Sequence, residues 1–188
     1  MLHIHKLIPQ GLGLAAVLLR RAATVTLDWD TRSHSRFDAT DSEGRALGVV
    51  LARGSVLRGG DVLVAEDGSL VRVLAAAQPV LRVRHCPEHG SRFDLMRAAY
   101  HLGNRHVALE LQAEHLQLEP DPVLAEMLRA MHLLVDEVEA AFEPEGGAYG
   151  GHAAGQGHGH GHAHEHPHKH DHGPSHGHGH GHDHGPRA

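Results

Sequence analysis

Aromatic residues and cysteine are scarce in this chain. Its 188 residues include three Phe, two Tyr, one Trp and a single cysteine, Cys86. The formal net charge is −6 with histidine neutral, and no basic stripe is present. These features disfavour nucleic-acid binding, which depends on clustered positive charge and stacking surfaces. One cysteine excludes an intrachain disulfide and fits a reducing compartment.

Long apolar runs are also missing. No stretch approaches the roughly 18 apolar residues that a membrane-spanning helix requires. The N-terminal sequence MLHIHKLIPQ lacks the charged start and apolar run of a signal peptide. We therefore expect a soluble, cytoplasmic protein that has no membrane partner.

Short apolar runs that alternate with turn signals fill the first eighty residues. Runs of this length and spacing predict a small all-β sandwich or barrel. Leu12–Ala23 is the exception, since its apolar density fits a short helix equally well. The expected strands are Leu2–Ile8, Thr24–Trp29, Ala46–Leu51, Asp61–Ala65 and Leu70–Leu74.

The pattern becomes mixed near Pro79. Val80–Arg84 is typical of a strand, and apolar residues then recur at helical spacing over Phe93–Leu102. We expect Gly103 and Asn104 to end this helix, because both residue types accept the left-handed backbone of a C-terminal cap.

Three further segments complete a second predicted domain. Val107–Leu111 and His115–Leu118 form a predicted hairpin, and Asp121-Pro122 combines a side-chain cap with proline at the first helical position. Val135–Phe142 is ambiguous, and we favour a final strand. The order strand, helix, strand, strand, helix, strand is that of a ferredoxin-like fold. The predicted fold class is therefore α+β.

The chain thus divides into three predicted parts. Residues 1–78 form a β-rich N-terminal domain, residues 79–148 a ferredoxin-like domain, and residues 149–188 a Gly/His-rich tail. From His152 to His184 the tail holds 14 His among 33 residues. Its small side chains offer little apolar area to offset the entropy of ordering a backbone. We expect the tail to be disordered until something binds it.

The tail histidines predict metal binding. Neutral imidazole suits Ni²⁺, Cu²⁺ and Zn²⁺, and its unperturbed pKa of about 6.5 leaves most rings free to ligate near pH 7. An engineered tag is a less favoured interpretation, because tags are usually uninterrupted His runs. Histidine alone does not select the metal, since Cu²⁺ stands above Ni²⁺ in intrinsic affinity. The predicted tail ligands are His152, His158, His160, His162, His164, His166, His168, His170, His172, His176, His178, His180, His182 and His184.

A further candidate ligand is His106, in the stretch AAYHLGNRHVALEL (Ala98–Leu111). It follows the predicted helix end and precedes a strand, so flanking structure holds it while its ring can face outward. A capping or packed histidine is the plainer interpretation of His106, and of His101 in the last helical turn. A metal site needs three to six donors. The missing donors must come from the tail, from a second protomer related by twofold symmetry, or from both.

Three stretches carry a resemblance to a known family. They are LARGSVLRGGDVL (Leu51–Leu63), AAYHLGNRHVALEL and FEPEGGAYGGH (Phe142–His152). In order and spacing they resemble the urease accessory protein E family, the nickel metallochaperones of urease maturation. The resemblance implies a β-rich domain that engages partners and a ferredoxin-like metal-binding domain that joins a homodimer. It also implies that His106 of each protomer is an interface ligand and that His152 completes the coordination.

The same resemblance implies partners and cargo. The partners are the nickel-handling GTPase of the pathway and the urease apoprotein complex, and the cargo is Ni²⁺, with Zn²⁺ or Cu²⁺ as competitors. Some family members carry an extra His-x-His pair just before the second helix of the metal domain. Here that position reads Glu119-Pro120-Asp121-Pro122, so we do not expect that auxiliary site.

The segment RHCPEHG (Arg84–Gly90) offers a competing site. The Cys86 thiolate with His85 and His89 suits Zn²⁺ or copper, and a cysteine beside a histidine also suits a nucleophile. Pro87 prevents the helix that would align the two rings, and no Asp or Asn orients them. The chain has no complete phosphate-binding loop, so we expect nucleotide binding to reside in a partner.

These observations together predict a non-enzymatic nickel carrier that delivers Ni²⁺ for assembly of the urease metallocentre. A general Ni or Zn store or buffer is the alternative. An enzyme that uses the cluster around Cys86 is a third and weaker hypothesis.

Overall fold

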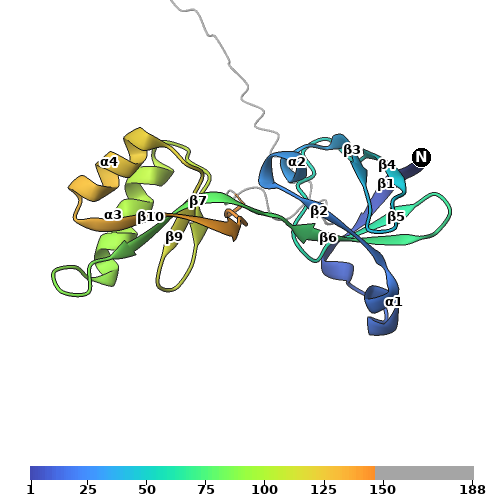
Figure 1. Cartoon of the computed structure of the whole chain (residues 1–188), viewed down its shortest axis with the longest axis horizontal. Helices are drawn as coiled ribbons and strands as arrows, with labels where there is room; N and C mark the ends of the chain where they lie inside the picture. Colours follow the sequence, from blue (N-terminus) through green and yellow to red (C-terminus); the bar gives the residue numbers. More distant parts are fainter. Residues whose placement is uncertain (147–188) are drawn as a thin grey trace, which may run out of the picture. The chain divides into compact units, whose positions relative to one another are not determined.

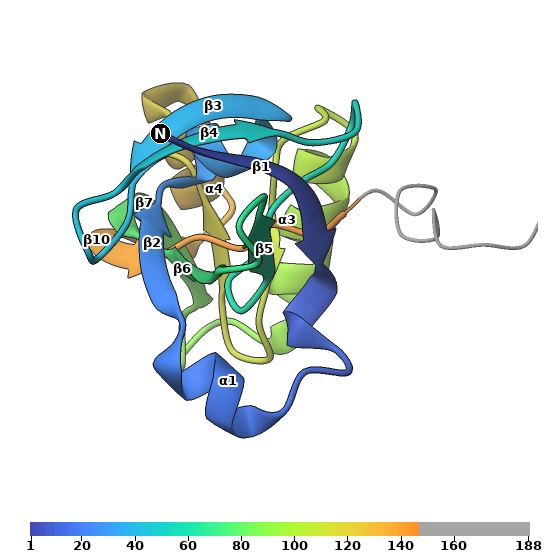
Figure 2. The same ribbon diagram turned by 90° about the vertical axis from the view of Figure 1, so that its right-hand side faces the viewer.

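The apolar runs of the first 75 residues form one mixed six-stranded sheet (Figures 1 and 2). The structure is a computed structural model, and it describes residues 1–146. The strand order is β2-β6-β5-β1-β4-β3, in which the β1–β4 and β2–β6 pairs are parallel and the other pairs antiparallel. The strands are β1 (Leu2–Ile8), β2 (Ala23–Leu27), β3 (Arg36–Thr40), β4 (Ala46–Val50), β5 (Val62–Ala65) and β6 (Leu70–Ala75).

Alternation of side chains fixes the register of this sheet. In β1, Ile4 is fully buried while His3 and His5 on either side of it are exposed. Ile4 joins buried residues of the other strands, among them Leu47, Leu63 and Val73, in one apolar cluster. The five strands predicted from the sequence are confirmed.

Two features of this N-terminal domain were not predicted. The edge strand β3 presents only Phe37 and Ala39 to the apolar side, too few apolar residues for a clear period-two pattern. The predicted strand at Thr24–Trp29 is too long, because the Asp28 side chain accepts a hydrogen bond from the Thr31 N–H at 2.9 Å and starts a helix. The short helices are η1 (Pro9–Gly11), α1 (Ala16–Arg21) and α2 (Trp29–Ser33).

The second half of the described chain forms a ferredoxin-like α+β domain, as predicted. Its four strands pair in the order β10-β7-β9-β8, all antiparallel. Buried residues of both helices pack with strand residues in a single cluster. The elements are β7 (Ala77–His85), α3 (Arg92–Gly103), β8 (Glu110–Leu111), β9 (Leu116–Leu118), α4 (Pro122–Ala130) and β10 (Leu133–Ala141).

Both long helices begin at side-chain caps. Ser91 and Asp94 form a reciprocal capping box at the start of α3. At α4 the Asp121 carboxylate accepts a hydrogen bond from the Leu124 N–H at 2.9 Å, and Pro122 follows it. The helix start predicted at Asp121-Pro122 is confirmed.

The remaining expectations concern membranes and the tail. Within residues 1–146, none of the helices combines the length and apolar character needed to cross a membrane. The predicted disorder of the tail concerns residues outside the described part of the chain.

The cap at Asp121 allows a test of the fold. Asp121→Ala removes the acceptor for the Leu124 N–H, so we expect the free energy of unfolding to fall by about 1 kcal/mol. Asp121→Asn keeps an acceptor and is expected to lose only a few tenths of that amount. Urea denaturation followed by far-UV circular dichroism measures both, and equal losses for the two variants would contradict the capping role.

Candidate metal centre

Helix α3 ends in a Schellman turn that has His106 at its corner. The N–H of Val107 donates to the carbonyl of Leu102 at 3.2 Å, and the N–H of His106 donates to the carbonyl of Gly103 at 2.9 Å. In this turn one residue just past the helix takes a left-handed backbone. That residue is His106, which has a φ of 57°.

The helix end predicted at Gly103 and Asn104 is confirmed, because α3 ends at Gly103 and Asn104 is its C-cap, but the left-handed backbone expected there lies two residues further on, at His106. Asn104 is right-handed, with φ −62°, and the Arg105 N–H still bonds to the Leu102 carbonyl at 3.0 Å. Val107 packs against the same apolar cluster as Leu102. Burial of Val107 therefore decides where the chain turns, and this overrides the preference of glycine and asparagine for the corner.

His106 is consequently restrained by its backbone while it stays exposed. A left-handed backbone costs a residue with a Cβ about 1 kcal/mol, although histidine tolerates it better than most residues. Such strain at an exposed residue is a reason to look for a function. His101, by contrast, is half-buried in the last turn of α3, where its ring packs edge-on against Tyr100 at 5.5 Å.

An apolar face of α3 leads toward His106. Phe93, Met96 and Tyr100 lie on one side of the helix at helical spacing, and their exposed fractions are 57%, 61% and 67%. Beside this face, a groove of about 410 Å³ runs between α3 and the β8–β9 hairpin, where Leu111 is also exposed. Isolated exposed apolar residues are common, but a contiguous face of this kind is typical of a binding surface.

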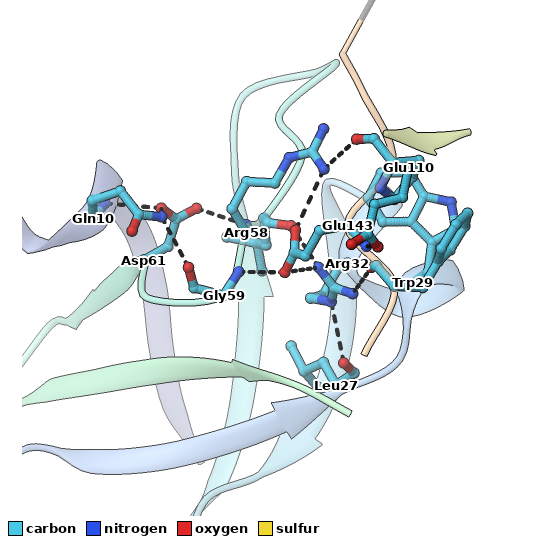
Figure 3. A network of polar contacts seen from close by, with 12 residues as sticks. Gln10, Leu27, Trp29, Arg32, Arg58, Gly59, Asp61, Glu110 and Glu143 are labelled. Atoms are coloured by element: carbon cyan, nitrogen blue, oxygen red, sulfur yellow. Dashed lines mark hydrogen bonds and ion pairs between the residues drawn. The ribbon is translucent and has the colours of Figure 1, made fainter. Parts of the chain in front are cut away.

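A second polar centre lies where residues 142–146, here called the tail root, meet the N-terminal domain. Figure 3 shows the Glu143 carboxylate between Arg32 and Gly59. It accepts hydrogen bonds from Arg32 Nη1 and the Gly59 N–H at 2.8 Å each, and from Arg58 Nη1 at 3.4 Å. Arg58 Nη1 also donates to the Pro144 carbonyl at 2.5 Å.

Aromatic packing and a buried guanidinium complete this centre. Arg32 is fully buried, and its Nη2 donates to the Phe142 carbonyl at 2.6 Å while its Nε donates to the Leu27 carbonyl at 3.1 Å. Phe142 is fully buried and packs edge-on against Trp29, with ring centroids 6.0 Å apart. The guanidinium groups of Arg32 and Arg58 lie 5.5 and 5.1 Å from the Trp29 ring, within cation–π range.

The tail root also bonds to the chain that follows His106. The Glu143 N–H donates to Glu110 Oε2 at 2.7 Å, and the Glu145 N–H donates to the Leu109 carbonyl at 2.8 Å. Residues of the stretches Leu51–Leu63 and Ala98–Leu111 thus meet at the tail root, which is the described part of the third stretch. The sequence analysis did not predict the roles of Arg32, Arg58 and Glu143. The available signal was that Arg58 and Glu143 are charged residues inside two of the stretches that carry the family resemblance.

The segment RHCPEHG places a thiol and one imidazole together. Cys86 Sγ lies 3.8 Å from His89 Nδ1, beside a cavity of about 620 Å³, whereas His85 Nδ1 contacts the Cys86 carbonyl. The nearby Asp94 carboxylate is engaged by Ser91, and the hydrogen bond from the Ser91 backbone N–H is the main cause that lowers the pKa of Asp94. Across residues 1–146, no three His, Cys, Asp or Glu side chains are grouped so that they could hold a metal ion.

The predicted ligands therefore divide into two groups. His106 is described, and within residues 1–146 it has no second and third donor beside it. His152 and the thirteen histidines from His158 to His184 lie outside the described residues.

Comparison with known proteins identifies relatives over both domains. Family models described as the N-terminal and C-terminal domains of the UreE urease accessory protein match residues 4–76 and 78–172. "Urease accessory protein UreE" of Methylibium petroleiphilum is 75% identical over 154 residues, which is 82% of this chain and 71% of the relative. The protein of the same name from Paracidovorax citrulli is 72% identical over 154 residues, 81% of this chain and 73% of its own length. That of Polaromonas sp. is 69% identical over 154 residues, with 81% and 70% covered.

The left-handed corner at His106 generates a stability test. His106→Gly removes the Cβ that the left-handed backbone disfavours, so we expect this variant to be about 1 kcal/mol more stable than His106→Ala. His132 is a matched control, because it follows α4 with a φ of 63° and is also exposed. Urea denaturation of the Gly and Ala variants at both positions measures the difference. An Ala variant as stable as the Gly variant would rule out backbone strain at that position.

Proposed function

The chain belongs to the UreE family of urease accessory proteins, and from this premise we propose that it carries Ni²⁺ to the urease metallocentre. Family membership itself assigns the chain an accessory role in urease maturation. The proposal adds the cargo, the site and the route by which the metal moves.

The observation that carries the proposal is His106. It is an exposed imidazole held on a restrained backbone, and within residues 1–146 it lacks the companions that a metal ion needs. Borderline ligands such as imidazole suit Ni²⁺. A second copy of the chain, related by a twofold axis, supplies an identical His106, and His152 of the tail supplies the next donor.

The apolar face of α3 supports this homodimer. Phe93, Met96 and Tyr100 are large and exposed, and they lie on the helix that ends at His106. An isologous interface brings the same patch of two protomers together. Contact through this face would bring the two His106 residues toward each other.

The tail histidines collect metal and pass it on. Fourteen imidazoles from His152 to His184 provide many weak, overlapping sites that raise the local concentration of Ni²⁺. A dimer site with few protein ligands keeps positions open, so that the donors of a partner can replace them one at a time. The partners are the nickel-handling GTPase and the urease apoprotein complex, in the cytoplasm. We further propose domain limits at residues 1–78 and 79–148, with the tail at 149–188.

A general Ni or Zn store is the alternative function, and Zn²⁺ or Cu²⁺ compete for the same imidazoles. A store depends on the number of histidines and not on His106. The two functions therefore differ in what happens when His106 alone is changed.

The dimer contact can be broken selectively. Met96→Lys puts a charge at the centre of the α3 face, so we expect the protein to become monomeric and to lose its tightest nickel site. Val123→Lys is the matched control, since Val123 is 72% exposed on the other long helix, α4. Sedimentation velocity gives the oligomeric state and calorimetry the nickel sites. A Met96→Lys protein that stays dimeric would exclude this face as the interface.

Nickel stoichiometry tests the division between the tail and His106. Removing residues 153–188 is expected to leave about one Ni²⁺ per dimer, because the two His106 residues and His152 remain. His106→Gly in the same shortened chain is expected to lose that ion without loss of stability, while His132→Gly retains it. Isothermal calorimetry counts the ions. Retention of the ion by the His106 variant would favour a store over a carrier.

A further inference from the structure

The residues between β7 and α3 form a closed turn that carries a thiol and an imidazole on one side. The Gly90 N–H donates to the Cys86 carbonyl at 2.8 Å, which closes the turn. A Cβ at Gly90 would come within 3.0 Å of the backbone nitrogen and oxygen of Cys86, so glycine permits this close approach. The turn brings Cys86 Sγ to 3.8 Å from His89 Nδ1.

The separation of these two atoms suits a shared metal ion. Zinc, taken as a guide to bond lengths, lies about 2.3 Å from a thiolate sulfur and about 2.0–2.1 Å from an imidazole nitrogen. With these bond lengths, two donor atoms 3.8 Å apart subtend about 120° at the ion, which is a trigonal angle. The sulfur and the nitrogen are therefore already spaced to bind one ion.

The number of donors selects the kind of ion. Among residues 1–146, no third His, Cys, Asp or Glu side chain completes a metal-holding group. His85 Nδ1 contacts the Cys86 carbonyl at 3.3 Å, and the Asp94 carboxylate accepts the Ser91 N–H at 2.8 Å. Zn²⁺ usually takes four donors, and Ni²⁺ favours square-planar or tetragonal sets of nitrogen and oxygen. Cu⁺ is a soft ion that sulfur ligands select, and its filled d shell is satisfied by two or three donors.

The surroundings of the pair suit a soft ion as well. Cys86 and His89 line the cavity of about 620 Å³, and the wall includes the thioether residue Met131 from the connection between α4 and β10. The cavity leaves room for the ion and for a third ligand. His89 is exposed and Cys86 is half-buried, so an ion can reach both side chains from solvent.

We propose that Cys86 and His89 form a Cu⁺-binding site that is separate from His106. Binding forms a bond from copper to Cys86 Sγ and another to His89 Nδ1, and the thiol proton passes to solvent. Copper enters and stays as Cu⁺, so the step needs no oxidant or reductant. The reducing conditions that keep Cys86 a free thiol also keep copper in this state. The site uses no residue of the proposed nickel site and does not depend on that function.

The single cysteine of the chain makes this site directly testable in the full-length protein. Bicinchoninate under nitrogen fixes the free Cu⁺ concentration, so that the tail imidazoles cannot deplete it. Alkylation of Cys86 by iodoacetamide is followed by peptide mass spectrometry. We expect saturating Cu⁺ to slow this reaction at least about tenfold, because a metal-bound sulfur is no longer a free thiolate nucleophile. X-ray absorption at the copper edge is expected to show sulfur and nitrogen neighbours.

Two histidine variants of the same segment separate a chelate from a lone thiol. His89→Ala removes the second donor, so the free Cu⁺ that gives half-maximal protection is expected to rise about tenfold, since the second bond of a chelate forms at high effective concentration. His85→Ala is the matched control and is expected to leave the value unchanged, because the His85 ring contacts a backbone carbonyl. Both variants keep Cys86, and far-UV circular dichroism checks that they fold.

Four outcomes would overturn the proposal. Cys86 that alkylates equally fast with and without Cu⁺ excludes the site. Equal shifts for His89→Ala and His85→Ala exclude the chelate. Equal protection by Zn²⁺ or Ni²⁺ at the same free ion concentration overturns the assignment to Cu⁺. Loss of protection in His106→Gly would show that the two sites are not separate, whereas loss of Ni²⁺ binding in that variant bears on the nickel site alone.

Discussion

A guanidinium without exposed surface is the constraint on which much of this structure depends. Arg32 is fully buried, so its charge needs acceptors within reach, and it takes them from Leu27, Phe142 and Glu143. Removing one partner of a buried ion pair typically costs about 3–5 kcal/mol, because the other charge stays buried and unpaired. The segment after β10 is therefore fixed by charge satisfaction, although it forms no strand or helix.

This pairing also explains why three distant stretches of the chain meet. Arg58 and Gly59 come from the first stretch, Leu109 and Glu110 from the second, and the tail root from the third. When each stretch is considered alone, nothing in it shows which partners its charged residues bond with. Together they join the end of the last strand to the loop that follows His106, which is the exposed imidazole with the restrained backbone.

Much of the fold was accessible from the sequence because its signals are local. Caps such as Asp121, strand alternation such as that around Ile4, and helical spacing over Phe93–Leu102 each depend on neighbours a few residues apart. Predictions were wrong where a distant contact decides. The left-handed turn after α3 lies at His106 because Val107 packs against the core, and β3 is recognised as a strand only by its pairing with β4.

The sequence by itself determined the α+β class, the ferredoxin-like order of elements, the family resemblance and the choice of His106 and the tail imidazoles as candidate ligands. Composition and short-range spacing carry all of these. Only the tertiary structure decided that His106 occupies a left-handed corner and that Glu143 bonds with Arg32 and Arg58. Residues 111 and 85 positions apart make those two ion pairs. Contacts over such separations depend on how the domains pack, and no local pattern records them.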